Sequence, residues 1–462
     1  MQYLKRRIEP HHRPTRRSSL PSLKETCPGV GTMGPAAYYP GRIIRLYVST
    51  RSCEAACHLE ASYSEGLPPF HTTIWPTDHW PTSPAWVKPM QLTINACAYE
   101  PGELKHYSLI RAGEGWDYHQ GPILYAFAED RLMMTWGAYD IQECSNDGVV
   151  LYSESHDHGE TWQTPQVFIG APNSVVSHLQ FARLEGSDEA LVVYREGHYY
   201  GAREDRKRKT SVGWANYAES PMSMLVRRSL DAGTTWLPPQ AIDTDIVVGR
   251  HTPPYYGSPE QLVQLASGAL VLLVVYMDPN RRDPQHFNIS FLRSEDGGRA
   301  WTKTCDVTVP DARGAMEPSV AEVAPGSLFG VVRNKSGSLY QLRSDDDGGH
   351  WQIEPTDIPT VESMARVLRL RSGRLLLVWN NESSPTQLPR HPLAAAVSDD
   401  EGHSWGPPKV LADEVGANQL SNFNLLQAAD GRILVCTSHY RAQTPACSDL
   451  DMLVFDETWL LA

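Results

Sequence analysis

Apolar residues recur along this chain in pairs of short runs that are separated by a small turn. In most pairs the turn contains a glycine, and each run has the length of one strand. Short apolar runs joined by tight turns predict antiparallel hairpins rather than helices. We expect six such hairpins, at residues 123–136, 179–194, 261–276, 319–333, 365–379 and 421–438.

A second pattern follows five of the six hairpins. It reads Ser-x-Asp-x-Gly-x-Thr-Trp, with Ala300, His350 or Ser404 in the threonine position of the last three copies. The Asp side chain accepts bonds from nearby backbone N–H groups, the Gly permits the positive φ of a tight turn, and the Trp packs between strands. Because one Asp per copy supplies too few oxygens for calcium, we expect a structural turn. The copies begin at Ser155, Ser229, Ser294, Ser344 and Ser398.

Six repeated units predict an all-β fold, a six-bladed β-propeller of four-stranded antiparallel blades, because a radial arrangement protects the sheet edges. We place the propeller at residues 116–462. Residues 1–35 are basic, lack periodicity and are expected to be disordered. Residues 36–115 read as an irregular region, within which GRIIRLYVST at 41–50 is the candidate for the strand that closes the last blade.

The charge and composition of the chain limit which partners it can bind and in which compartment it is expected. The chain has 41 Lys and Arg against 54 Asp and Glu, a net charge of −13, which argues against nucleic acid and anionic membranes as partners. No apolar run is long enough to cross a bilayer, and the basic start lacks the apolar run of a signal peptide. The compartment stays open, with the cytoplasm slightly favoured. The eight cysteines show no ligand spacing and no cofactor-binding glycine motif is present, so we expect neither metal nor cofactor.

The repeated boxes and hairpins over residues 115–460 resemble the Asp-box sialidase superfamily, and most closely the bacterial exo-α-sialidase-like proteins with BNR repeats. In that family one blade opens with Glu-Pro-Ser-Val and carries an Arg sixteen positions later, as Glu317 and Arg333 do here. A further Arg precedes the Ser of a late box by eight residues, as Arg390 precedes Ser398. The resemblance implies a glycoside hydrolase in which arginines bind a sugar carboxylate and Glu317 takes the proton of a tyrosine nucleophile.

Two family features are missing from the sequence. Sialidases begin the first blade with Arg-Ile-Pro, where this chain has Gln120-Gly121-Pro122, and the expected tyrosine of the last blade is replaced by Leu420-Ser421-Asn422. Aligning the turn glycines of the blades suggests replacements that would face the same end of the channel. For the arginine these are Arg195 and Arg441; for the tyrosine they are Tyr440, our choice, and Tyr276 and Tyr194. The same alignment places Asn380 beside Arg333 as a substrate-binding residue.

The remaining chemistry concerns the acid and the histidines. The acid of sialidases falls in the first blade's loop, where this chain offers Asp140, our choice, Glu143 and Asp147. His119 and His178 lie near blade entries and are candidates for the pocket lining.

Three functions are compatible with these residues. The first is an exo-sialidase-like hydrolase that releases a terminal acidic sugar from a glycan. The second is a hydrolase or lyase for another acidic sugar. The third is a glycan-binding propeller without catalysis.

Overall fold

The structure is a computed structural model that describes residues 57–61, 70–74, 92–113, 115–139, 143, 146, 148–171, 174–199, 203–205, 210–212, 220, 222–249, 257–278, 280, 285–443 and 446–462. The chain divides into residues 1–45, which lie outside the described part, and residues 46–462, which contain every described element. The disorder that the sequence predicts for residues 1–35 therefore lies outside the described residues.

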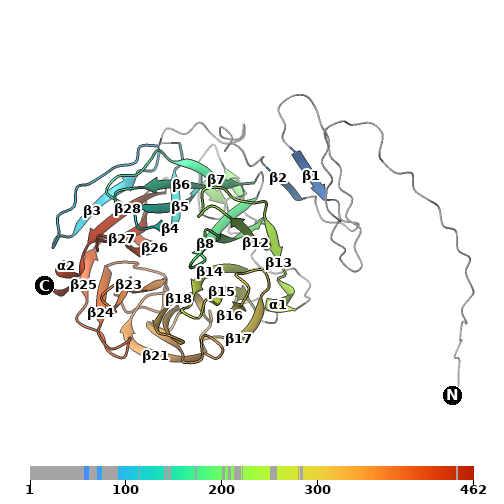
Figure 1. The fold of residues 1–462 in the computed structure, drawn as a ribbon. Helices are drawn as coiled ribbons and strands as arrows, with labels where there is room; N and C mark the ends of the chain where they lie inside the picture. Colours follow the sequence, from blue (N-terminus) through green and yellow to red (C-terminus); the bar gives the residue numbers. More distant parts are fainter. Residues whose placement is uncertain are drawn as a thin grey trace, which may run out of the picture. The chain divides into compact units, whose positions relative to one another are not determined.

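The described part of residues 46–462 has an all-β, propeller-like fold in which four four-stranded antiparallel sheets stand in a ring (Figure 1). The first sheet consists of β8 (Val175–Arg183), β9 (Ala190–Gly197), β12 (Met222–Ser229) and β13 (Gln240–Ile242). The second consists of β14 (Gly257–Gln264), β15 (Leu270–Met277), β16 (Phe287–Ser294) and β17 (Thr302–Val307). The third consists of β18 (Met316–Ala324), β19 (Ser327–Arg333), β20 (Ser338–Ser344) and β21 (Gln352–Pro359). The fourth consists of β22 (Ala365–Arg369), β23 (Leu375–Asn380), β24 (Leu393–Ser398) and β25 (Lys409–Ala412).

The ring is completed by an eight-stranded sheet that contains two antiparallel sets. One set consists of β4 (Tyr118–Ala128), β5 (Arg131–Tyr139), β6 (Val149–Ser155) and β7 (Gln166–Gly170). The other consists of β26 (Gln419–Gln427), β27 (Ile433–Arg441), β28 (Cys447–Phe455) and β3 (Lys105–Ile110). A single parallel pair, Ser448 with Tyr118, joins the two sets.

The strand beside β28 differs from the one that we expected. β3 pairs antiparallel with β28 over Lys105–Ile110, and so a segment before the first hairpin joins the last one. We expected this strand at residues 41–50, which lie outside the described residues.

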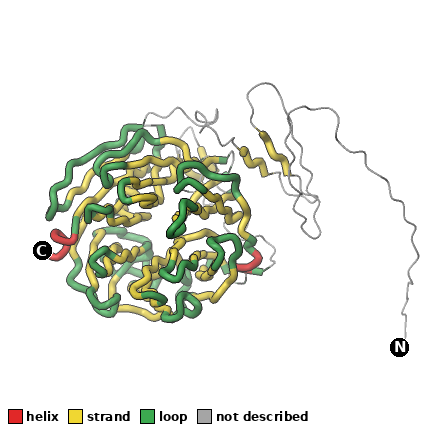
Figure 2. The backbone as a smooth tube through the Cα atoms, viewed as in Figure 1, coloured by secondary structure: helices red, strands yellow, loops and turns green. Residues whose placement is uncertain are grey.

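The remaining described elements are short. They are the hairpins β1 (Cys57–Ala61) with β2 (Phe70–Ile74) and β10 (Arg203–Asp205) with β11 (Thr210–Val212), and the helices α1 (Asp245–Val248) and α2 (Glu457–Leu461). Helix among the described residues is confined to these two segments (Figure 2). Neither helix is long enough to cross a membrane.

The Asp boxes form the turns between the third and fourth strands of their sheets. In the first box, Ser155 Oγ donates to Asp157 Oδ1 at 2.8 Å and accepts from the backbone N–H of Gly159 at 2.9 Å. The backbone N–H of Thr161 donates to the same Asp157 oxygen at 2.8 Å. Gly159 has a φ of +89°, a backbone conformation that residues with a side chain rarely adopt. The predicted structural role of the motif is confirmed.

The box tryptophans connect neighbouring sheets. Trp351 stacks on Phe291 of the preceding sheet with ring centroids 4.3 Å apart. Trp405 packs on Phe329 of the preceding sheet in a tilted arrangement, with centroids 5.9 Å apart. Aromatic pairs of this kind add stability beyond the area that they bury. Because the strands alternate in direction, the boxes lie at one end of each sheet, while the starts of the first strands lie at the other.

Candidate active site

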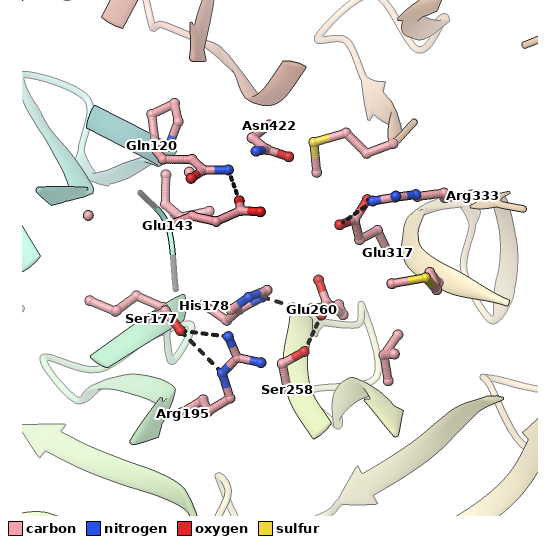
Figure 3. A pocket seen from close by; sticks show the side chains of 18 of the residues that line it. Gln120, Glu143, Ser177, His178, Arg195, Ser258, Glu260, Glu317, Arg333 and Asn422 are labelled. Atoms are coloured by element: carbon pink, nitrogen blue, oxygen red, sulfur yellow. Dashed lines mark hydrogen bonds and ion pairs between the residues drawn. The ribbon is translucent and has the colours of Figure 1, made fainter. Parts of the chain in front are cut away.

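A cavity of about 550 Å³ opens where the first strands of the sheets begin. These strands contact one another in the order β4, β8, β14, β18 and β22 to β26, and β26 contacts β4, so they surround a common axis. Each contributes side chains to the lining. Figure 3 labels those from β4, β8, β14, β18 and β26. Residues far apart in the sequence therefore meet in one pocket, at the end opposite the Asp boxes.

Four of these strands share a local distortion at the pocket. In each, pairing with the second strand skips two residues, and the first of the two has a positive φ. Such insertions bend a strand and redirect a side chain. Positive φ is costly for residues other than glycine and tends to be kept at functional sites. The four residues are Gly121 (+60°), His178 (+55°), Glu317 (+42°) and Asn422 (+50°).

Glu317, which is largely buried, and Arg333, which is buried, form an ion pair on this lining. Both carboxylate oxygens of Glu317 accept from Arg333 Nη1 at 2.9 Å. Burial alone would raise the pKa of Glu317, but the charges of Arg333, Arg390 and Arg366 outweigh it and hold the pKa below its usual value. Glu317 is therefore ionised at neutral pH. The sequence prediction that Arg333 accompanies Glu317 agrees with this geometry.

Arg390 and Arg366 line the same pocket, and neither has a carboxylate partner among the residues that the structure describes. Arg390 donates from Nε and Nη2 to the backbone carbonyls of Gln387 and Glu362, at 3.2 and 3.3 Å. Arg366 likewise reaches only backbone carbonyls, those of Pro318 and Phe423. Burial and the positive charge of Arg333 lower the pKa of Arg390 to about 10. Among the described residues, no carboxylate oxygen lies within 4.0 Å of either guanidinium.

The charge of the pocket is opposite to that of the chain. Its described lining contains five arginines and three glutamates, an excess of two positive charges with histidine neutral, whereas the whole chain carries −13. A low-dielectric pocket with unpaired guanidinium groups favours an anionic ligand. The five arginines are Arg195, Arg313, Arg333, Arg366 and Arg390, and the glutamates are Glu143, Glu260 and Glu317.

Gln120 occupies the position where sialidases have the first arginine. Its side-chain amide donates to Glu143, which belongs to the loop after β5 (Figure 3). The negative charge of Glu143 favours the charged form of both Arg333 and Arg390, and in Arg390 it offsets only part of the lowering of the pKa by burial and by Arg333. The loop that the sequence indicated for the acid therefore brings a carboxylate to the arginines. Asp140, our choice, and Asp147 lie outside the described residues.

Arg195 lines the pocket, as the alignment of the turn glycines suggested. Its guanidinium donates to Ser177 Oγ at 3.0 and 3.2 Å and to Tyr199 Oη at 2.8 Å. Arg441, the other suggested replacement, pairs with Asp449 at 3.0 Å and is not among the described lining residues.

The tyrosines that we chose from the sequence do not line the pocket. Tyr440 pairs with Gln419, before the insertion at Asn422, and its ring lies 6.1 Å from that of Tyr118. Tyr194 is only 1% exposed and lies within the hydrophobic core. Tyr276 is also buried, and this burial raises the pKa of its hydroxyl to about 12. The tyrosines that do line the described pocket are Tyr139 and Tyr199, which follow or end second strands.

Two further predicted residues also lie away from the pocket. Asn380 is fully buried and its amide donates to the backbone carbonyl of Leu420 at 3.0 Å, so it positions backbone rather than ligand. His119 is also fully buried, and its Nδ1 accepts from Trp136 Nε1 at 3.2 Å.

His178, in contrast, belongs to the pocket and lies beside Glu260. Its Nδ1 is 3.3 Å from Glu260 Oε1, which accepts from Ser258 Oγ at 2.5 Å. Sequence reasoning missed Glu260 and Arg366. Glu260 directly precedes the expected hairpin at 261–276, and Arg366 is the second residue of the one at 365–379. A charge at the start of an apolar strand costs free energy unless it is paired or functional, and that was the available signal. No group of residues suited to hold a metal ion occurs in the described part of the chain.

Comparisons with known proteins agree with this architecture. Residues 208–435 match the family described as the BNR repeat-like domain. A sialidase of Micromonospora viridifaciens is 30% identical over 226 residues, which cover 42% of this chain and 33% of that protein. The match thus spans about a third of the length of the curated relative.

Solved structures show the same fold. The Hadza microbial sialidase Hz136 has a TM-score of 0.60 at 16% identity, over 87% of this chain and 74% of that chain. The Trypanosoma rangeli sialidase has a TM-score of 0.56 at 14% identity, over 76% of this chain and 56% of that chain. Residues 208–435 therefore resemble a BNR repeat-like domain, part of the chain is similar in sequence to a sialidase, and the chain shares its propeller fold with solved sialidases, in agreement with the resemblance predicted from the Asp boxes.

Proposed function

We propose that this chain is a sialidase-like glycoside hydrolase that releases a terminal acidic sugar from a glycan. The observation that carries the proposal is the pocket in which ionised Glu317 stands among buried arginines, two of which have no carboxylate partner in the described structure. The carboxylate of an acidic sugar would be the partner that these two arginines lack. Carbohydrate is then the partner of the chain, with no part for nucleic acid or a membrane.

The proposal includes a six-bladed propeller. The two antiparallel sets of the eight-stranded sheet meet through one parallel pair only, and each set has the strand order of a blade. If each of these two sets is counted as a blade, the four separate sheets bring the number of blades to six. In this arrangement β3 closes the last blade, and the domain that binds the sugar begins before residue 116.

Arg390 and Arg333 are the proposed carboxylate-binding residues, with Arg366 beside them. Arg333 is partly neutralised, since Glu317 is bonded to it and Glu362 lies 3.6 Å away. Arg390 keeps Nη1 without a partner among the described residues. A guanidinium that is already held in place binds a carboxylate with little loss of entropy. Arg195, across the pocket, is the candidate for contacts with the rest of the sugar.

The nucleophile in this proposal is a water molecule. Asn422, which lines the pocket, belongs to the segment Leu420-Ser421-Asn422 where the sialidase resemblance implies a tyrosine, and Tyr440 is not retained because it is not among the described lining residues. Glu317 then takes a proton from water as the water oxygen attacks the anomeric carbon, which is a single displacement with inversion. The sequence predicts Asp140 as the acid, and that residue lies outside the described part of the chain.

The test is release of a fluorescent aglycone from a panel of glycosides that includes sialosides. Wild type should hydrolyse an acidic-sugar glycoside, and E317Q should lose about a hundredfold or more of kcat. E354Q is the matched control, because Glu354 is exposed on β21 of the same sheet. Turnover by E317Q at the wild-type rate would refute the role of Glu317. Binding of the sugar without turnover by wild type would favour the glycan-binding alternative, for which the missing tyrosine is the specific observation.

A further inference from the structure

The side of the pocket formed by β8 and β14 holds a histidine that is oriented by a buried carboxylate. Glu260 is 4% exposed and accepts from Ser258 Oγ, while its Oε1 lies 3.3 Å from His178 Nδ1. A carboxylate that contacts Nδ1 fixes the ring and stabilises the protonated imidazole. Ser258 in turn fixes the carboxylate. Figure 3 shows this group across the pocket from Asn422.

The backbone presents His178 to the cavity in the same way as Glu317. Both residues are the first of a two-residue insertion, and both have a positive φ. A histidine has no need of that strained conformation for packing, and its side chain is 31% exposed rather than enclosed in the core. Nε2 of His178 has no protein partner among the described residues. The imidazole thus keeps one nitrogen for a ligand.

The charged groups around His178 come from four other strands or loops. Glu260 on β14 is the nearest, and Arg366 on β22 is in turn influenced by Glu260. Arg195 on β9 is bonded to Ser177, the neighbour of His178. Glu143 reaches the pocket from the loop after β5. The direct ionic neighbour of the imidazole is therefore a carboxylate.

We propose that His178, positioned by Glu260, is the general acid that protonates the leaving group in this pocket; the inference rests on the proposed function and gives His178 the role predicted for Asp140. The imidazolium Nε2–H transfers its proton to the glycosidic oxygen. The bond between that oxygen and the anomeric carbon breaks, and its electron pair goes to the oxygen. The attacking water forms the new bond to carbon and gives its proton to Glu317. One proton is given and one is taken, so the hydrolysis balances.

Leaving groups of different acidity separate a general acid from a structural histidine. H178Q should lose about a hundredfold or more in kcat/KM on a glycoside with a poor leaving group such as an alcohol. It should lose less than about tenfold on a 4-nitrophenyl glycoside, whose phenolate leaves without a proton. A structural role would lower both rates equally. The exposed His156 gives the matched control H156Q, expected to behave as wild type on both substrates.

A second variant tests the positioning role of Glu260 even if H178Q folds poorly. E260Q removes the carboxylate that orients the imidazole, so it should also lose more kcat/KM on the alcohol glycoside than on the 4-nitrophenyl glycoside, and E260D should restore part of that difference. Equal losses on the two substrates, in H178Q or in E260Q, would overturn the assignment while leaving the hydrolase intact. A wild type that turns over no acidic-sugar glycoside would refute the proposed function and this inference together.

Discussion

Glu317 and Arg333 face each other across the β18–β19 hairpin, with both carboxylate oxygens 2.9 Å from one guanidinium nitrogen. Sixteen residues separate them in the sequence, and the hairpin register returns Arg333 opposite Met316, the neighbour of Glu317. The pair is buried, and so its two charges depend on each other.

Removing only the arginine should therefore destabilise the fold. R333M leaves the Glu317 charge buried without its hydrogen-bonded partner, and we expect a loss of about 3–5 kcal/mol in the free energy of unfolding. The double variant E317Q/R333M should recover part of that loss. Guanidinium denaturation of the wild type, both single variants and the double variant measures the coupling. Additive losses would contradict a coupled pair.

Arg390 should determine affinity rather than folding. Its side chain bonds only backbone carbonyls, so R390M should weaken binding of a free acidic sugar about tenfold or more. R390K should restore little of the affinity, because lysine cannot make the paired contact. Titration calorimetry with N-acetylneuraminic acid measures both. Unchanged affinity in R390M would exclude Arg390 from the carboxylate site.

Replacing a glycine of an Asp box by alanine should destabilise the fold more than the same replacement at a glycine of similar φ that has open space around it. A Cβ on Gly233 would lie 2.5 Å from the Phe127 ring, whereas one on Gly268 would meet nothing within 4 Å. Both glycines have positive φ, +81° and +86°. G268A should therefore cost only the backbone strain, about 1–2 kcal/mol, and G233A should cost more because the ring must move. Thermal unfolding of the two variants compares them, and equal losses would be inconsistent with the close packing.

The free energy of unfolding should depend on pH through Asp451, which lies on β28 of the eight-stranded sheet. This carboxylate accepts from His439 Nδ1 at 2.7 Å and from His106 Nε2 at 2.9 Å. Burial would raise the pKa of Asp451, but these bonds lower it to about 2, so its contribution is present above about pH 4 and is lost as the pH falls toward 2. Burial would lower the pKa of His439, but Asp451 raises it, so that contribution is present below about pH 6.5 and is lost at higher pH.

D451N tests this directly. The difference in the free energy of unfolding between wild type and D451N should be largest from about pH 4 to 6.5 and should shrink on both sides. A difference that does not change with pH would show that the cluster contributes through packing alone.

The hairpins and boxes were predictable because their signals are local. Alternating apolar runs and turn glycines specify β-hairpins, and each box satisfies its own hydrogen bonds within seven residues. Glu317 and Arg333 were found for the same reason, since one hairpin register relates them. The six-blade count and the domain boundaries remain predictions.

The misses concern relations between distant segments. β3 was not recognised because its partner β28 lies more than 330 residues later and nothing within KHYSLI specifies that pairing. Tyr440 was chosen by counting from the turn glycine, but β27 continues past the level of the pocket. His178 and Glu260 come from neighbouring sheets, so only the packing of β8 against β14 brings them together.

The most direct test of the central claim compares a sialoside with its methyl ester, using the same fluorescent leaving group. If buried arginines bind the sugar carboxylate, wild type should hydrolyse the acid with a kcat/KM about a hundredfold or more above that of the ester, and R390M should lose most of this preference. Equal rates on the acid and the ester, or release from neither, would contradict the account.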